Sequence, residues 1–424
     1  MWRDKTHRKK LRYFIPDWDD LVDLDYDFIK DEHSSGKGNW SNQVYAHQMY
    51  SAPNYDGILV SRAVAEFNKQ KKERINEMGV HRFLRVPRDL PLMGDCGAFD
   101  YIKEEVPPYS TEDVLDYYTR LDFDYGVSVD HLIVSSTADQ KRFRYDLTIQ
   151  NAEDFIKEHR KAKLDWEPIG AVQGWDPQSY AKAAEQYVKM GYQYIALGGM
   201  VRSTSKEILQ TVTAVRQKVP PSIKLHVFGI ARLNAMNALV SAGVNSVDSA
   251  SHLRRAWLGA GQNYFTLSGK SYTAIRIPQA DKSFRAKRMV TEGRATLSKV
   301  QGLEANCLRL VRDYDTGKAE KNSVLDALCD YDELVAENRV SIRPLLDKLL
   351  TDKPWKACPC DICKKDGIEV VIFRGNNRNR RRGFHNTYVF YHVLQQILNT
   401  GQMPEGLLTG KNKGQLELFE GVTA

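Results

Sequence analysis

The sequence predicts an α/β fold: a (β/α)8 TIM barrel followed by a helical insertion and a small C-terminal subdomain. Short apolar, β-rich runs alternate with amphipathic helical segments through residues 1–250, and this alternation favours a parallel sheet covered by helices. Eight such runs can be identified, and eight strands are the number that closes a barrel of this type. An open, doubly wound sheet is the structural alternative.

The eight predicted strands are short and separated by polar, turn-forming segments. They are Leu11–Ile15, Gly57–Ser61, Leu90–Gly94, Tyr125–Asp130, Ile169–Gln173, Tyr194–Gly198, Leu225–Gly229 and Ser246–Ala250. The first has the weakest support, because the long segment 16–56 separates it from the second. Helical periodicity between the strands predicts helices at Val64–Met78, Ser110–Leu121, Asn151–Lys161, Pro177–Met190, Ser205–Val219 and Ala231–Ala242.

The composition is that of a globular protein with a large core. Of 424 residues, 42% are hydrophobic and 27% are charged, which excludes a wholly disordered chain. No apolar run approaches the roughly 18 residues of a membrane span, and the N-terminal MWRDKTHRKK lacks an apolar signal region. We therefore expect neither a membrane segment nor export. The 61 Lys and Arg residues against 54 Asp and Glu give a net charge of +7, a mild tilt toward polyanionic partners.

Beyond the predicted barrel the pattern changes. Residues 263–278 are typical of a β-hairpin with its turn at 268–270, and the stretch after them is charged and helical. We expect three units: residues 1–280 as the barrel with an N-terminal extension, 281–352 as the helical insertion, and 353–424 as a subdomain packed on the barrel.

Three of the six cysteines crowd into Cys358-Pro-Cys360-Asp-Ile-Cys363, and His385 follows them. Three thiolates and one imidazole are the ligand set of a closed tetrahedral zinc site, so we predict a structural Zn²⁺ without an open position for water. His392 competes as the fourth ligand, but it lies in an apolar helical segment, where a packed core histidine is the simpler interpretation. The reduced cysteine cluster favours a cytoplasmic location.

The predicted strands end on residues that are suited to chemistry. In (β/α)8 barrels the reactive groups lie at the carboxyl ends of the strands. The residues at these ends are Asp95, Asp130, Gln173, Gly198, Gly199, Phe228, Gly229 and Asp248. Each alone is explained as a turn residue or helix cap, but their convergence on one rim favours a functional site.

Several short motifs occur in order along the chain. They are GDCGAF at 94–99, AVQG at 171–174, ALGG at 196–199, VDSASHLRRA at 247–256, the cysteine cluster, and His385-Asn386. Together they resemble the tRNA-guanine transglycosylase superfamily over nearly the whole chain from the second strand onward. The opening RYFIPDWDDLVDLDYDF is most similar to the DNA-guanine transglycosylases of 7-deazaguanine DNA-modification systems.

The resemblance implies exchange of guanine for a 7-deazaguanine, here 7-cyano-7-deazaguanine, without cleavage of the polymer backbone. It implies that Asp248 is the nucleophile that forms a covalent glycosyl-enzyme and that Asp95 is the acid and base for the departing and incoming bases. Burial and the second carboxylate should raise the pKa of Asp95 and leave Asp248 ionised.

Base recognition also carries over by resemblance. Asp130 is expected to accept hydrogen bonds from N1–H and the exocyclic amine of the purine, with a salt bridge at the barrel mouth as the alternative. Gln173 and the backbone of Gly198 and Gly199 are expected to contact the carbonyl edge. Phe99 and Phe228 match positions that sandwich the base, with core packing as the alternative for either ring.

Phosphate contacts are expected from Arg254 and Arg255 and from an arginine run at 374–382 that contains no acid. The residues predicted for this role in the run are Arg378, Arg380, Arg381 and Arg382. A solvated charged loop before a helix at Thr387–Leu398 is the alternative. The second arginine of the family pattern after Asp248 is replaced by Trp257, which fits an altered polymer.

Three functions remain in order of preference. The first is base exchange in DNA, the second is the same chemistry on tRNA, and the third is a non-catalytic nucleic-acid-binding accessory subunit. The presence of both Asp95 and Asp248 argues against the third. The expected partners are the nucleic acid, the free 7-deazaguanine base and, by resemblance, a partner ATPase of the same modification system.

Overall fold

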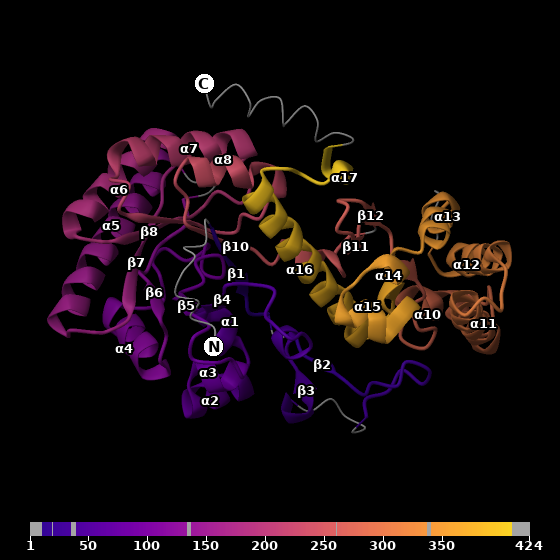
Figure 1. Cartoon of the computed structure of the whole chain (residues 1–424). Coiled ribbons are helices and arrows are strands. Elements are labelled where there is room, and N and C mark those ends of the chain that lie inside the picture. The colour runs from indigo at the N-terminus through magenta and orange to yellow at the C-terminus, as the bar shows by residue number, and fades with distance from the viewer. Residues whose placement is uncertain are drawn as a thin grey trace.

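The computed structural model describes residues 11–18, 20–34, 40–133, 137–259, 261–336 and 341–408. Eight parallel strands form a closed barrel, in which β1 closes the circle between β10 and β4 (Figure 1). The strands are β1 (Arg12–Pro16), β4 (Gly57–Ser61), β5 (Leu92–Asp95), β6 (Tyr125–Val127), β7 (Glu167–Val172), β8 (Tyr194–Leu197), β9 (Lys224–Val227) and β10 (Ser246–Asp248). The predicted barrel is confirmed, and the open sheet is excluded.

The first strand, which had the weakest support in the sequence, is confirmed by its register. Phe14 lies beside Asp248 on one side and beside Gly57 on the other. Inward-facing side chains fill the barrel as one buried cluster, as expected for a barrel whose interior is a packed core. The cluster contains Phe14, Leu59, Met93, Val127, Ile169, Ala171, Tyr194 and Ala196.

The barrel helices are α1 (Arg62–Phe67), α2 (Lys69–Met78), α3 (Val80–Leu84), α4 (Thr111–Leu121), α5 (Ala138–Lys161), α6 (Pro177–Met190), α7 (Ser205–Lys218), α8 (Met236–Ser241) and α9 (Ser251–Arg255). Side-chain caps explain where the predicted boundaries were wrong. The single helix predicted at Val64–Met78 is two helices, because the Asn68 side chain accepts a hydrogen bond from the Lys71 amide and starts α2. Helix α5 begins well before the predicted Asn151, at a capping box formed by Thr137 and Gln140.

Short strand pairs lie outside the barrel, one between β1 and β4 in the sequence and one after β10. The strands β2 (Val22–Asp23) and β3 (Gln43–Val44) pair antiparallel. The predicted hairpin is confirmed as β11 (Tyr264–Phe265) against β12 (Ser271–Tyr272). None of the described helices combines the length and apolar character that crossing a membrane would need.

Helices α10 (Phe284–Thr291), α11 (Leu297–Asp315), α12 (Lys321–Ala336) and α13 (Arg343–Asp352) form a group on the side of the molecule away from the barrel helices (Figure 1). The chain then returns through α14 (Pro354–Ala357), α15 (Asp361–Asp366), β14 (Ile372–Phe373), α16 (Gly375–Thr400) and α17 (Glu405–Leu408). Strand β14 pairs in parallel with β13 (Ile275–Arg276), the segment that leaves the barrel. The division at residues 280 and 352 stays a prediction.

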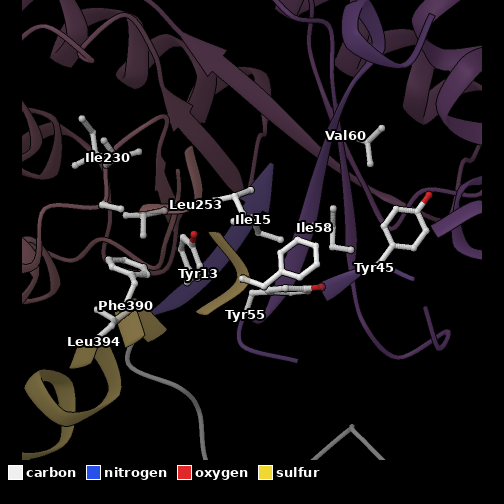
Figure 2. Close-up of a cluster of buried hydrophobic side chains, with 14 of the residues drawn as sticks. Tyr13, Ile15, Tyr45, Tyr55, Ile58, Val60, Ile230, Leu253, Phe390 and Leu394 are labelled. Atoms are coloured by element: carbon white, nitrogen blue, oxygen red, sulfur yellow. The ribbon is translucent and has the colours of Figure 1, made fainter. Parts of the chain in front are cut away.

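Helix α16 joins this C-terminal segment to the barrel. It starts at Gly375 rather than at the predicted Thr387, so the arginine run is helical. Its apolar face packs on the outside of β1, where the rings of Phe390 and Tyr13 meet edge to face with centroids 4.7 Å apart. Figure 2 shows this contact, with Leu394 and Leu253 beside it.

Three arginines of α16 are buried, and carboxylates or backbone carbonyls accept their hydrogen bonds. Arg381 binds both carboxylate oxygens of Asp366 at 2.8 and 2.9 Å and donates to the carbonyls of Asp23 and Leu24. Arg378 is paired with Asp31 and Glu369. Arg382 donates to backbone carbonyls of the segments that flank α16, including Ala256 at 2.7 Å. Asp366 and Glu369 lie only 15 and 9 residues before their arginine partners. The other partners, Asp31 and the carbonyls of Asp23, Leu24 and Ala256, come from segments far away in the sequence.

We expect Arg381→Met to lower the free energy of unfolding by about 3–5 kcal/mol, because it leaves the buried carboxylate of Asp366 without its ion-pair partner. Denaturant unfolding measures this loss. The matched control is Arg142→Met on α5, which removes a solvent-exposed pair with Asp146 and should leave the free energy of unfolding nearly unchanged. Equal losses in the two variants would contradict a structural role for the α16 arginines.

Candidate active site

A cavity of about 650 Å³ opens at the carboxyl ends of the barrel strands. This volume is within the range of small-molecule sites, which is roughly 300–1,000 Å³. All of the predicted catalytic and base-binding residues line it: Asp95, Phe99, Asp130, Gln173, Gly198, Gly199, Phe228 and Asp248. The structure therefore brings together, from six different strands or the loops after them, the residues that the sequence predicted as one site. Their roles stay predictions.

Asp95 ends β5 and is the carboxyl group with the most strongly shifted acidity in the cavity. Burial, and then the charge of Asp130, raise its pKa to about 7, and the charge of Asp248 acts in the same direction. The amide of Gly97 donates to Asp95 at 3.0 Å and partly opposes this shift. A carboxyl group with this pKa can hold a proton near neutral pH and can also release it.

Asp248 ends β10 and is held through one oxygen. Its Oδ1 accepts hydrogen bonds from the backbone amide of Gly229 at 2.9 Å and from Nε2 of His226 at 3.1 Å. Within the described part of the chain, no hydrogen-bond donor is recorded for Oδ2 of Asp248. One carboxylate oxygen is thus fixed by two donors, and the other is not held by any described residue.

Asp130 and Gln173 form a pair on neighbouring strands. The Gln173 amide donates to Oδ2 of Asp130 at 2.6 Å, while its own Oε1 is buried and has no hydrogen-bond partner among the described residues. Burial raises the pKa of Asp130 to about 6, and the Gln173 hydrogen bond opposes that shift. A pair with one buried, unsatisfied acceptor is suited to a ligand that brings hydrogen-bond donors.

The two glycines after β8 are required by the position of the Gln173 side chain. A Cβ atom at Gly198 would lie 2.2 Å from Nε2 of Gln173, and one at Gly199 would lie 2.7 Å from Oε1. Gly199 also has a φ angle of +76°, which side-chain-bearing residues rarely adopt. The glycines therefore let the amide of Gln173 lie flat against the backbone at the cavity wall.

The aromatic residues of the cavity differ in exposure. Phe99 is 59% exposed, whereas Phe228 is partly buried and packs against the ring of His226. Trp18, which the sequence analysis did not single out, also lines the cavity and lies under the guanidinium of Arg254, 4.3 Å from it. The cavity mouth thus combines exposed aromatic surface with positive charge.

The predicted phosphate contacts divide into two groups. Arg254 and Arg255 line the cavity, and Arg255 is exposed, so both are accessible to a polymer. The prediction was wrong for three of the four arginines of the run. Arg378, Arg381 and Arg382 are at most 1% exposed and saturated by acids and carbonyls, so they cannot reach a phosphate.

For Arg380 the phosphate contact stays a prediction, because its side chain is 30% exposed. It is half-buried, donates to the Leu21 carbonyl at 2.8 Å and lies 3.7 Å from Asp20. Its charge is therefore used to hold the N-terminal segment against α16. The alternative of a solvated, disordered loop is excluded as well, because the run is helical.

The cluster of Cys358, Cys360, Cys363 and His385 can hold a metal ion, since all four ligand atoms lie within 4.8 Å of one another. Nδ1 of His385 is 3.3–3.5 Å from the three sulfurs, close to the separation of about 3.6 Å that tetrahedral zinc geometry requires. Nε2 of His385 lies 2.9 Å from the Phe265 carbonyl, which fixes the tautomer with a free Nδ1 lone pair. His392, the competing ligand, packs against the ring of Tyr388 instead.

Sequence reasoning missed the residues behind Asp248. His226, Ser246 and Tyr194 are buried inside the barrel and connected to Asp248 by hydrogen bonds. The signal was available, because side chains two positions apart on a strand share a face. His226 precedes Phe228 by two positions, and Ser246 precedes Asp248 by two.

The chain is similar in sequence to one known family and to several known proteins. A profile of the family described as queuine tRNA-ribosyltransferase matches residues 42–287. A DNA-guanine transglycosylase from Salmonella montevideo is 34% identical over 410 residues, which cover 92% of this chain and 98% of the relative.

Two archaeal relatives match a shorter part. The tRNA-guanine(15) transglycosylase of Methanopyrus kandleri is 25% identical over 206 residues, which are 47% of this chain and 43% of the relative. That of Pyrococcus furiosus is 22% identical over 204 residues, which are 47% of this chain and 34% of the relative. With its barrel and its Cys3His cluster, the chain belongs to the queuine tRNA-ribosyltransferase family and is an enzyme, a pentosyltransferase of the guanine transglycosylase type.

Proposed function

We propose that this enzyme exchanges guanine in DNA for a 7-deazaguanine, 7-cyano-7-deazaguanine, through a covalent aspartyl-glycosyl intermediate. The observation that carries the proposal is the single cavity in which Asp95 and Asp248 lie beside the base-binding pair of Asp130 and Gln173. Two carboxyl groups that share one cavity, one of them able to hold a proton near neutral pH, are what glycosyl transfer with retention requires.

In the first half-reaction, Oδ2 of Asp248 attacks the anomeric carbon and the bond from that carbon to guanine N9 breaks. The electron pair leaves with N9, and Asp95 supplies the proton that neutralises the departing base. In the second half-reaction, Asp95 takes the N9 proton of the incoming base, N9 attacks the anomeric carbon, and the ester bond to Asp248 breaks. Atoms and charge balance, and the polymer backbone is never cut.

Base selection follows from the polar groups of the cavity wall. Ionised Asp130 accepts hydrogen bonds from N1–H and the exocyclic amine, which guanine and 7-deazaguanines share. The second amide proton of Gln173 and the backbone of Gly199 face the carbonyl edge. Stacking on Phe99 and Phe228 contributes about 1–3 kcal/mol per contact. None of these contacts involves position 7, where the two bases differ.

DNA is favoured as the polymer by the relative that matches this chain over nearly its full length, a DNA-guanine transglycosylase. Arg254 and Arg255 are proposed to contact phosphates beside the cavity. Because the site lies inside a barrel mouth, the target nucleotide must leave the base stack to reach it, which favours unpaired or deformable DNA.

Exchange on tRNA is the second candidate, and the two archaeal relatives favour it. Purified enzyme is incubated with labelled guanine and with single-stranded DNA, duplex DNA or tRNA, with and without ATP and the proposed partner ATPase. Incorporation into DNA supports the proposal, and incorporation into tRNA alone overturns it. Incorporation into neither polymer under any of these conditions also overturns the proposal.

We expect Asp248→Asn to abolish base exchange and also the adduct between protein and nucleic acid that survives denaturation, because an amide oxygen is too weak a nucleophile for the anomeric carbon. Adduct is measured on a denaturing gel after incubation with the polymer. Asp154→Asn on the outer face of α5 serves as the control and should leave both readouts unchanged. Adduct formation by the Asp248 variant would refute the nucleophile assignment.

Adduct formation by the unaltered enzyme should slow above about pH 7, approaching a tenfold decrease per pH unit. The pKa of Asp95 is raised to about 7, so the protonated form that must neutralise departing guanine is lost as pH rises through that value. Single-turnover rates at several pH values measure the effect. Asp95→Asn should form adduct slowly at every pH and should not show this decrease above pH 7. If that variant shows the same decrease, the titrating group is not Asp95.

We propose Zn²⁺ as the resident ion of the Cys3His cluster, where it would crosslink the segment 358–363 to α16. Bound zinc supplies stability at this closed site and takes no part in the base exchange. The thiolates require a reducing environment, which is consistent with a cytoplasmic enzyme.

Metal analysis should find one zinc ion per chain in the unaltered protein and much less than one in Cys360→Ser, which should also unfold at a lower temperature. Cys329→Ser is the control, because Cys329 lies on α12 outside the cluster. A full zinc content in the Cys360 variant would exclude the cluster as the zinc site.

A further inference from the structure

Behind Asp248, three polar side chains continue one hydrogen-bonded line through the barrel interior. Nε2 of His226 lies 3.1 Å from Oδ1 of Asp248, Nδ1 of His226 lies 2.6 Å from Oγ of Ser246, and that oxygen lies 2.5 Å from the hydroxyl of Tyr194. The side chains come from the adjacent strands β8, β9 and β10. His226 and Ser246 are fully buried, and Tyr194 is 4% exposed.

The direction of these bonds follows from the number of protons available. Ionised Asp248 only accepts, so Nε2 of His226 must carry a proton. With a neutral imidazole, Nδ1 accepts the Ser246 hydroxyl proton, and the Ser246 oxygen accepts the proton of Tyr194. Each proton of the line then has an acceptor.

A positively charged imidazolium at His226 would not allow this pairing of donors with acceptors. Its Nδ1–H would donate to Ser246, and either the Ser246 proton or the Tyr194 proton would be left without an acceptor among the described residues. Buried hydroxyl groups without partners are rare. The geometry therefore selects the neutral imidazole that donates toward Asp248.

We propose that His226, Ser246 and Tyr194 are positioning residues for the covalent step. Their hydrogen-bonded line keeps Oδ1 of Asp248 as a hydrogen-bond acceptor, so that Oδ2 is the oxygen that bonds to the sugar. The proposal rests on the proposed function, because it takes Asp248 as the nucleophile. It concerns the neighbours of that residue, to which the resemblance assigns no role.

The hydrogen bonds to Oδ1 affect the two half-reactions differently. When Oδ2 bonds to the anomeric carbon, Oδ1 becomes the ester carbonyl oxygen and continues to accept from His226 and Gly229. When the incoming base takes over the anomeric carbon, the electron pair of the ester C–O bond returns to the carboxylate. Donors aimed at Oδ1 stabilise that returning negative charge, so they favour breakdown of the intermediate more than its formation.

The decisive experiment follows adduct formation and adduct breakdown separately in single turnovers. The full-length enzyme is mixed with the polymer that supports exchange, and free guanine is added after the adduct has formed. His226→Phe keeps a ring of similar size but removes the donor. We expect breakdown to slow at least tenfold and formation less than threefold, so that adduct accumulates at steady state.

Conservative and remote variants separate positioning from a loss of packing. His226→Gln retains an amide donor and should restore most of the breakdown rate. Ser246→Ala should slow breakdown about threefold to tenfold without changing KM for the base, and Tyr194→Phe should have a smaller effect in the same direction. These two variants keep the proposal testable if His226→Phe fails to fold.

Tyr192→Phe is the matched control. Tyr192 is as buried as His226 and also loses a hydrogen bond, from its hydroxyl to the Ala152 carbonyl, but it has no link to Asp248. Its kinetics should be those of the unaltered enzyme. Equal slowing of formation and breakdown in the His226 and Ser246 variants, or no slowing in either, overturns the positioning role. Exchange by Asp248→Asn would instead overturn the proposed function itself.

Discussion

The docking of α16 on the barrel is the constraint on which the rest of the structure depends. One face of this helix carries His385 into the cysteine cluster, and another places Phe390 on Tyr13 of β1. Between them, the Asn386 side chain donates to the His252 and Asn263 carbonyls and accepts from the Phe265 amide. A single helix thus holds the metal-binding segment, the first barrel strand and the chain that follows Asp248.

This arrangement connects a remote metal cluster to the chemistry of the barrel mouth. Arg382 donates to the Ala256 carbonyl at the end of α9, and α9 carries Arg254 to the cavity. Asp248 lies three residues before α9, so the position of its strand end depends on how α9 is anchored. A metal ion bound to the cluster would therefore act on the active site through α16 and α9 rather than through the reacting atoms.

Three carboxyl groups in one cavity would repel one another if they were equally ionised. The structure separates them by environment. Asp248 receives two donors on one oxygen, and Asp130 receives one from Gln173. Asp95 receives backbone hydrogen bonds from Gly97 and Cys96, but burial and the charges of Asp130 and Asp248 outweigh them and raise its pKa to about 7.

The barrel and the rim of its mouth could be predicted because both depend on local pattern. Strand and helix alternation gave the eight strands, including β1, and the residue that ends each strand must face the mouth. The helix boundaries at Asn68 and Thr137 depend on single side-chain caps, which periodicity does not register.

The arginine run could not be interpreted from local sequence. Its charges look unbalanced over nine residues because the compensating acids, Asp31, Glu369 and Asp366, come from other segments. A solvated basic loop, a phosphate-binding loop and a buried ion-pair network share the same local composition. Only the tertiary structure distinguishes them.

Trp257 illustrates why a departure from a family pattern needs a structural explanation before a functional one. Its replacement of an arginine fitted an altered polymer, but its ring lies against α16 at Gly383. A Cβ atom there would come within 2.9 Å of Trp257 and 2.8 Å of the Leu253 side chain. Glycine at 383 and tryptophan at 257 are therefore complementary, and the pair closes the contact between α9 and α16. The substitution is explained by helix packing, so the choice between DNA and tRNA must rest on residues that remain accessible at the mouth, Arg254, Arg255 and Trp18.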